Sequence, residues 1–351
     1  MASPRRPPHR SRRRRLVGIG VGLAITALTF AFVLPRIADY GQVWGVVRRL
    51  SWQEILLLLG ATALNLVTFA PPWMVALPGL GFRRAFAVTQ ASTASTYIAP
   101  GGAAVGVALS YAMLRAWGFR AGPVGLAAAL TGIWNQLALL GFPPLALVLL
   151  TLEREQNPLL QSVALIGLVV FVVAAGAFAA GLSSPKLARS VGDEAARVAD
   201  WALRCVRRRP VRWTGESFVR FRNDAVGLLA RRWHLLTVTT LAGQLSVFLV
   251  LLTSLRVLHV SAHEVGLVEA FAAWSLVRLL GSLPITPGGI GVVEVGLTGA
   301  LVGFGGRDAE VVAAVLVYRF LTIVPTLVLG LAAGATWRRF KPARHREAAV
   351  P

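Results

Sequence analysis

The chain has 351 residues, of which 56% are hydrophobic and only 15% charged, and its mean hydropathy is +0.66. Soluble domains rarely sustain this balance, so the composition indicates a membrane protein with several spans. The single cysteine excludes an intramolecular disulfide.

Six apolar runs are long enough to cross the hydrocarbon core, which takes about 20 residues. In chain order they are 16–34, 55–79, 123–150, 161–182, 234–258 and 311–336. Two further apolar stretches, 85–118 and 265–304, are each interrupted by Pro-Gly-Gly. We therefore predict an all-α polytopic membrane protein with about six full spans and two broken hairpins.

Basic segments adjoin these runs and carry most of the net charge of +21. Residues 1–15 hold seven arginines and no acid, 183–233 hold twelve basic and five acidic residues, and 337–351 hold five basic residues and Glu347. Basic loops stay on the cytoplasmic side and attract anionic lipid head groups, so we place all three there. We expect a plasma-membrane protein with both termini cytoplasmic, a retained first span, and no nucleic-acid partner.

The two interrupted stretches resemble each other. Residues 99–120 align without gaps to 286–307, an offset of 187. The same offset moves the second span close to the fifth and the third span onto the sixth. The charge pattern makes the first unit open inward and the second outward, so we predict an inverted repeat of two membrane halves, 16–182 and 234–336, joined by the connector 183–233. That arrangement is typical of transporters; the alternative is a chance similarity between spans rich in alanine and glycine.

The interruptions should break helices inside the membrane. They consist of Pro100, Gly101 and Gly102 in the first stretch, and of Pro287, Gly288 and Gly289 in the second. Proline removes a backbone donor and paired glycines permit conformations closed to other residues. Such a break survives only when buried in protein or lining a polar cavity. A new helix beginning near Ile290 would present free N–H groups that favour a phosphate or carboxylate, although a tight packing kink is the alternative.

Three charged residues lie inside the apolar runs of the second half. Antiparallel helices would bring Glu294 and Arg319 to a similar depth, where isolated charges are expensive and pairing is expected. Arg278, nine residues before Pro287, is able to reach the same region. Either the pair is structural, or Glu294 holds an arginine that contacts an anionic head group. The polar residues Asn65, Asn135, Gln136 and Gln244 are expected mainly to bond between helices.

The sequence "PGGIGVVE", followed by "VLVYRFLTIVPTLVLG", resembles the flippase-like family, also described as the lysylphosphatidylglycerol synthase transmembrane region. The family motif falls on Pro287, Gly288, Gly289, Gly291, Glu294 and Arg319. The resemblance implies lipid translocation, since in the bifunctional synthases this region moves an aminoacylated phospholipid to the outer leaflet. It does not extend to the aminoacyl-transferase domain, so we expect no synthesis. In the alignment of the two halves, Val107 occupies the position equivalent to Glu294, so the two halves should differ in role.

The function that these patterns favour is translocation of an anionic phospholipid or a polyprenyl-linked lipid, without catalysis. A membrane-embedded transferase or accessory subunit of envelope glycolipid assembly, and a scaffold without transport, are the alternatives. His259 and His263 have metal-ligand spacing but no third ligand, and no nucleotide-binding loop is present, so we expect neither metal nor cofactor. Membrane lipids are the expected partners, while a separate lipid-modifying enzyme and a second copy of the chain stay open.

Overall fold

The computed structural model describes residues 48, 50–98, 102–153, 158–184, 186, 215–282 and 287–339. Every regular element in these ranges is a helix, as the composition predicted. The predicted first span, 16–34, lies outside the described residues, as do the basic N-terminal tail, most of the connector 183–233 and most of the C-terminal tail.

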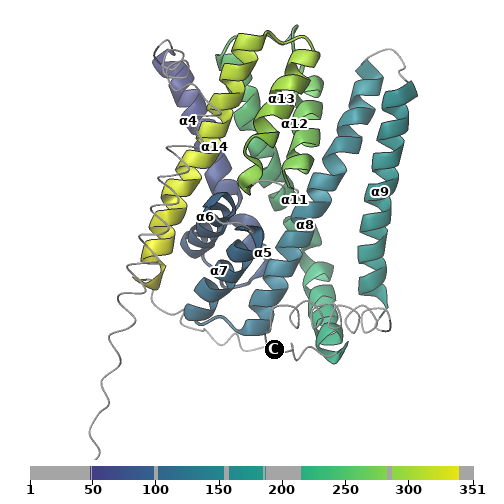
Figure 1. Cartoon of the computed structure of the whole chain (residues 1–351). Coiled ribbons are helices and arrows are strands. Elements are labelled where there is room, and N and C mark those ends of the chain that lie inside the picture. Colours follow the sequence, from purple (N-terminus) through teal and green to yellow (C-terminus); the bar gives the residue numbers. More distant parts are fainter. Residues whose placement is uncertain are drawn as a thin grey trace, which may run out of the picture.

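Five helices in the described part of the chain are long and apolar enough to cross a membrane. They are the joined pair α4 (Trp52–Thr68) and α5 (Pro71–Ala76), then α8 (Ala121–Glu153), α9 (Pro158–Ser183), α11 (Gly215–Val257) and α14 (Asp308–Thr336). These helices confirm the second to sixth predicted spans. Because they run back and forth between the two ends of the molecule (Figure 1), the described chain is a multi-pass membrane protein.

Two of these spans differ from the prediction in shape. The second was predicted as one helix, 55–79, but α4 ends at Thr68 and a separate α5 begins at Pro71. Pro71 and Pro72 lack the N–H donors that a continuous helix needs, and both are tolerated in the first turn of α5. The fifth is longer than predicted, since α11 includes the last part of the connector in one 43-residue helix.

The two broken hairpins are present and are too short to span. The first consists of α6 (Phe82–Ile98) and α7 (Gly102–Ala116), and the second of α12 (Leu267–Gly281), the short 3-10 turn η2 (Pro287–Gly289) and α13 (Val292–Gly303). Helices of 12 to 17 residues reach about 18–26 Å, less than the ~30 Å of the hydrocarbon core. In Figure 1, α6 and α7 occupy the lower half of the bundle and α12 and α13 the upper half.

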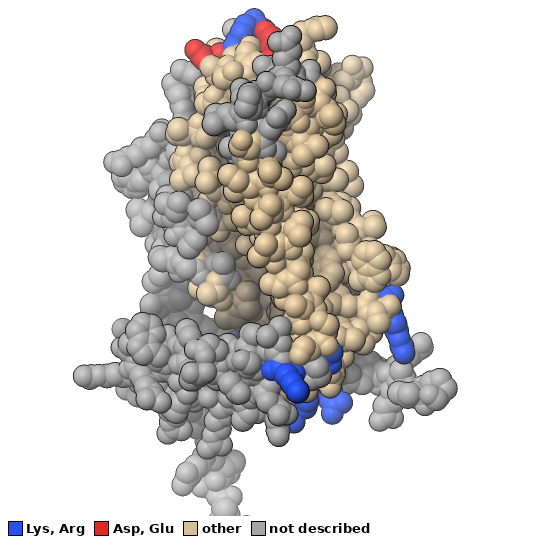
Figure 2. All heavy atoms as spheres, turned by 90° about the vertical axis from the view of Figure 1, so that its right-hand side faces the viewer, with Lys and Arg blue, Asp and Glu red and all other residues tan. Residues whose placement is uncertain are grey.

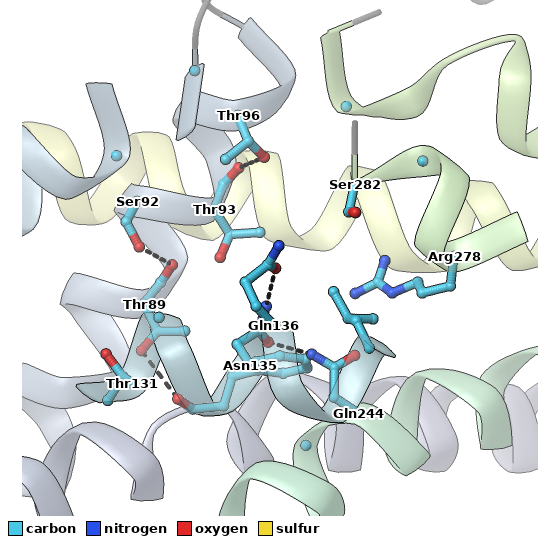
Figure 3. A pocket seen from close by; sticks show the side chains of 18 of the residues that line it. Thr89, Ser92, Thr93, Thr96, Thr131, Asn135, Gln136, Gln244, Arg278 and Ser282 are labelled. Carbon is cyan, nitrogen blue, oxygen red and sulfur yellow. Dashed lines mark hydrogen bonds between the residues drawn. The ribbon is translucent and has the colours of Figure 1, made fainter. Parts of the chain in front are cut away.

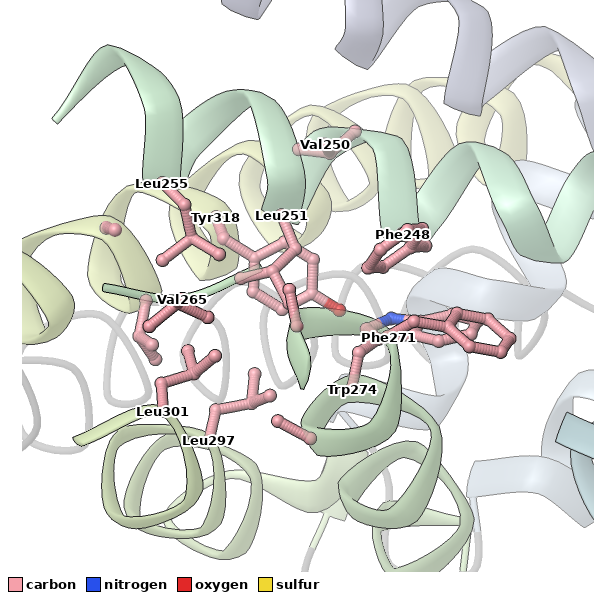
Figure 4. Packing of buried hydrophobic residues seen from close by; sticks show 14 of the residues in the cluster. Phe248, Val250, Leu251, Leu255, Val265, Phe271, Trp274, Leu297, Leu301 and Tyr318 are labelled. Atoms are coloured by element: carbon pink, nitrogen blue, oxygen red, sulfur yellow. The ribbon is translucent and has the colours of Figure 1, made fainter. Parts of the chain in front are cut away.

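Each hairpin packs into a core of its own. The upper core joins α11, α12, α13 and α14, and the rings of Phe248, Phe271 and Trp274 lie within it with centroids 5.2–5.8 Å apart (Figure 4). The lower core joins α5, α6, α7 and α8 around Trp117 and Met113, which are fully buried. The hairpins are therefore fixed in the bundle by side-chain packing rather than by the connecting loops.

Charged side chains gather at the two ends of the molecule and leave an apolar band between them. Figure 2 shows only basic side chains at the lower end and both signs at the upper end of the visible face. The lower end includes the start of α6 with Arg83 and Arg84, while the upper end carries Glu264, Arg307 and Glu310. This distribution is typical of a protein whose ends lie in water and whose middle lies in lipid.

Candidate functional site

The break between α12 and α13 has a backbone that only glycine adopts easily. Gly288, Gly289 and Gly291 have φ angles of 62°, 68° and 86°. A Cβ at Gly288 would lie 2.2 Å from the Tyr97 ring, and one at Gly289 would lie 2.9 Å from Val293. Tyr97 belongs to the last turn of α6, so the tips of the two hairpins touch each other near the middle of the bundle.

The Glu294 side chain links the backbone of this break to Arg319. One carboxylate oxygen accepts the Gly291 N–H at 2.6 Å, and the other accepts Arg319 Nε at 2.5 Å. Arg319 also donates from Nη2 to the Gly288 carbonyl at 3.1 Å. The ion pair that we expected between Glu294 and Arg319 is therefore present, and it closes a network around the non-helical backbone.

The start of α13 differs from our expectation in one respect. The helix begins at Val292 rather than near Ile290, and its cap N–H, that of Gly291, already donates to Glu294. The same arrangement recurs at Gly266, whose N–H donates to Glu269 three residues later at 2.8 Å. A carboxylate three residues into a helix neutralises the positive end of its dipole. The acid within "PGGIGVVE", Glu294, thus caps the helix to which it belongs.

A cavity of about 940 Å³ lies beside the break. It is bounded by α5, α6, α7, α8, α11, α12, α13 and α14, and it is partly open to the outside. Figure 3 shows the polar side chains that face it: Thr89, Ser92, Thr93, Thr96, Thr131, Asn135, Gln136, Gln244, Arg278 and Ser282. A pocket of this volume is in the upper part of the range that small-molecule sites occupy.

Arg278 has a buried donor that none of the described residues satisfies. Its side chain points from α12 into the cavity on the side of Gln244 (Figure 3). Its Nε is buried without a hydrogen-bond partner, and Arg278 forms no ion pair with any described residue. A guanidinium has five donors and no acceptor, so this one is suited to an anion that enters from outside the protein.

The amide side chains opposite form a bridge between two spans. Gln244 Nε2 donates to Asn135 Oδ1, and Asn135 Nδ2 donates to Gln136 Oε1 at 3.4 Å. The predicted inter-helix bonding is therefore observed for Gln244 and Asn135, whereas the bond between Gln136 and Asn135 stays within α8. Among the described residues, Gln244 Oε1 is buried without a partner. Asn65 likewise bonds to Ser246 at 3.1 Å, away from the cavity.

The structure brings several predicted site residues together. Arg278, Gly288, Arg319 and Gly102 all line the cavity, as does Val107, the counterpart of Glu294. Gly102 is tightly enclosed, because a Cβ there would lie 2.4 Å from the Ser95 carbonyl. Glu294 lies behind the lining. Pro100 and Gly101 lie outside the described residues, as does the side chain of Pro287.

The hydroxyl groups of α6 were not predicted as part of the site. Thr89, Ser92, Thr93 and Thr96 recur every three or four residues in "TQASTAST" and share one face of the helix. Three of them bond to backbone carbonyls of their own helix at 2.7–3.0 Å, as Thr89 does to Ala85. The spacing was a usable signal, since hydroxyls at this period form a polar stripe on an otherwise apolar helix.

The sequence matches the family described as Lysylphosphatidylglycerol synthase TM region over residues 18–330. The chain belongs to this family. The match includes both broken hairpins and the whole network around Glu294. None of the curated proteins matches the chain. Family and membrane-crossing helices together define a multi-pass membrane protein of lipid-related function.

Proposed function

We propose that this protein is a lipid translocase that moves an anionic phospholipid or a polyprenyl-linked lipid between the leaflets of the plasma membrane. The observation that carries the proposal is Arg278, a guanidinium that pairs with none of the described residues and lines a cavity at the point where two broken hairpins meet. Intramembrane charges are expensive to maintain and commonly mark a substrate pathway. The family supplies the link to lipids.

The proposal includes an inverted repeat, which two observations support. The offset of 187 that separates Pro100 from Pro287 also relates the first residue of α8, Ala121, to the first residue of α14, Asp308. The two broken hairpins, α6–α7 and α12–α13, occupy opposite halves of the bundle (Figure 1). In transporters with this symmetry, substrate binds near the bilayer midplane, where discontinuous helices of the two repeats face each other.

The physical task of such a site is to replace water around a polar head group. A phosphate in hydrocarbon pays the full cost of desolvation, whereas in the cavity it would meet the donors of Arg278. The partly open side would let the acyl chains stay among other lipids. A basic lower end in the cytoplasm would put the cavity, which both broken hairpins line, inside the membrane.

The proposal assigns this chain no catalytic step, no metal and no cofactor, and membrane lipids are its partners. A lipid-modifying enzyme on another chain would supply a modified lipid, if the substrate is one. A second copy of the chain is compatible with the exposed apolar face of α9.

Reconstitution into liposomes tests the proposal. A fluorescent analogue of phosphatidylglycerol is placed in both leaflets, and a membrane-impermeant reductant bleaches whatever reaches the outer one. We expect the full chain to make nearly all of the label accessible, and empty liposomes to stop at about half. Replacing Gly288 and Gly289 together with leucine should reduce the rate to that of empty liposomes while leaving membrane insertion intact. A wild-type rate equal to that of empty liposomes, across phospholipid and polyprenyl-phosphate probes, would exclude translocation.

A further inference from the structure

The charge of the cavity has one sign. Its described lining contains two arginines, Arg278 and Arg319, and no aspartate or glutamate. The short stretches at the two breaks that the structure does not describe, 99–101 and 283–286, contain no acid in the sequence either. Glu269, the acid nearest to Arg278 along the chain, does not line the cavity. Glu294 is the acid nearest to the second break, and both of its oxygens are taken by Gly291 and Arg319.

The two arginines differ in what they have left to donate. Arg319 is 7% exposed and is committed to Glu294 and to the Gly288 carbonyl. Arg278 has no such commitment among the described residues, and its buried Nε lacks a partner. A ligand anion would therefore gain most at Arg278, where it satisfies a donor that is already desolvated.

Neutral groups that lack a hydrogen-bond partner among the described residues line the same cavity. Gln244 Oε1, Ser110 Oγ and Thr240 Oγ1 are buried and have no hydrogen-bond partner in the described structure. An amide oxygen only accepts, so Gln244 needs a donor from the ligand, and the two hydroxyls are able to donate or accept. Hydroxyl groups of the ligand, which both donate and accept, are suited to groups of these kinds.

We propose that the cavity recognises a phosphate that carries an uncharged, hydroxyl-bearing group, and that it rejects a head group bearing an ammonium. The inference rests on the proposed function and narrows its substrate class. Glycerol or sugar hydroxyls would hydrogen-bond to the neutral groups that lack a partner, and the phosphate would pair with Arg278. An aminoacylated head group would bring its ammonium beside the guanidinium of Arg278 with no carboxylate in the described lining to face it, and such like-charge contacts are how sites exclude wrong ligands.

Binding to the wild-type chain in detergent tests the inference without any substitution. The probes are short-chain phosphatidylglycerol, its lysyl ester, and sn-glycerol 3-phosphate, with dissociation constants from microscale thermophoresis. We expect phosphatidylglycerol to bind at least tenfold more tightly than the lysyl ester. Equal or tighter binding of the lysyl ester would overturn the inference. If glycerol phosphate binds as tightly as the lipid, the same chemistry is supported, but with a soluble ligand as its source.

Substitutions then locate the charge that makes the choice. Arg278→Gln should weaken phosphatidylglycerol binding at least tenfold, and Arg278→Lys should retain part of it. Arg120→Gln removes the same charge from the exposed lower end and should change nothing. Val107→Glu places an acid on the cavity wall. It should reduce the difference in affinity between phosphatidylglycerol and its lysyl ester. An Arg278→Gln protein that is folded and binds normally would also overturn the inference.

The outcomes separate this inference from the translocase proposal. Selective binding without lipid movement in liposomes would keep the head-group assignment and exclude translocation. Lipid movement with equal rates for phosphatidylglycerol and its lysyl ester would keep translocation and exclude the assignment.

Discussion

Glu294 and Arg319 meet in an ion pair with Nε and Oε1 2.5 Å apart, although 25 residues separate them in the chain. The two side chains are only 9% and 7% exposed. Their remaining hydrogen bonds go to the backbone of the break, at Gly291 and Gly288. The pair therefore provides the partners that a non-helical backbone in a membrane requires.

Removing one member of this pair should destabilise the fold strongly. Glu294→Gln strands Arg319, and Arg319→Met strands Glu294, in a low-dielectric interior. Each single substitution should cost about 3–5 kcal/mol of unfolding free energy. The measurement is thermal stability in detergent, followed for each variant beside the wild type.

The double variant separates structure from lipid binding. With Glu294→Gln and Arg319→Met together, no charge is stranded, so much of the stability should return. Glutamine still accepts the Gly291 N–H, while the Gly288 carbonyl loses its donor. If Arg278 is the residue that holds the lipid, the double variant should recover lipid movement along with stability. A stable double variant that moves no lipid would instead assign Arg319 to the lipid.

Alanine at Gly288 and at Gly291 should have different effects. Both glycines have positive φ, which costs a residue with a Cβ about 1–2 kcal/mol. At Gly291 the added Cβ meets open space, so Gly291→Ala should lose only that amount. At Gly288 the same atom would lie 2.2 Å from the Tyr97 ring, so Gly288→Ala should lose clearly more. Equal losses in a thermal unfolding assay would show that the tips of the hairpins do not touch.

Much of the fold was predictable because lipid imposes simple requirements. Apolar runs of about 20 residues can only be spans, and Pro-Gly-Gly can only interrupt a helix. The bend at Pro71 was not predicted, since the apolar run continues through it and composition alone does not register a lost hydrogen bond. The length of α11 was missed because its first part, around Arg220, is polar and continues past the membrane boundary.

The site was predicted in part, and its limits have a physical reason. The ion pair of Glu294 and Arg319 followed from depth and from the cost of a buried charge. The sequence did not predict that Arg319 pairs with Glu294 while Arg278 does not. It places two arginines near one acid along the chain but does not show which of them forms the ion pair. The hydroxyls of α6 face the cavity because residues far along the chain, on α8, α11 and α12, complete its walls.

The crossing of α6 and α14 should depend on one glycine. A Cβ at Gly330 would lie 2.4 Å from the Gln90 carbonyl, and Gly334, one turn further along α14, has nothing within 4 Å. Gly330→Ala should therefore cost about 1–3 kcal/mol through overpacking. Gly334→Ala is the matched control and should be neutral or slightly stabilising, because alanine favours helix. Similar unfolding temperatures for both variants would contradict the close packing of these helices.

The loop between α11 and α12 should make stability depend on pH. The Glu264 carboxylate accepts the Ser261 N–H at 2.9 Å and pairs with Arg307 at 3.0 Å. These contacts, the Ser261 bond first, hold the pKa of Glu264 below its usual value of 4.5. A lowered folded-state pKa contributes stability above the unfolded-state pKa and loses it as the pH falls through the folded-state value.

Glu264→Gln should accordingly lower the unfolding temperature slightly at pH 7, and the difference from wild type should shrink once the pH falls below 4.5. Asp308→Asn serves as the control, since it removes a charge from the same end without touching Ser261. A difference that persists unchanged at acid pH would mean that the carboxylate charge of Glu264 is not what stabilises the loop.

Equivalent residues of the two halves should face opposite sides of the membrane. Ala121 and Asp308 begin α8 and α14, and they are separated by the offset that relates the two breaks. Both are exposed, so each is replaced singly by cysteine in a Cys205→Ser background. Because the lower end is basic, we expect Ala121→Cys to react with an impermeant thiol reagent only after the cells are permeabilised. Asp308→Cys should react in intact cells. Two cysteines that label from the same side would exclude an inverted repeat, because an axis in the membrane plane must exchange the two faces.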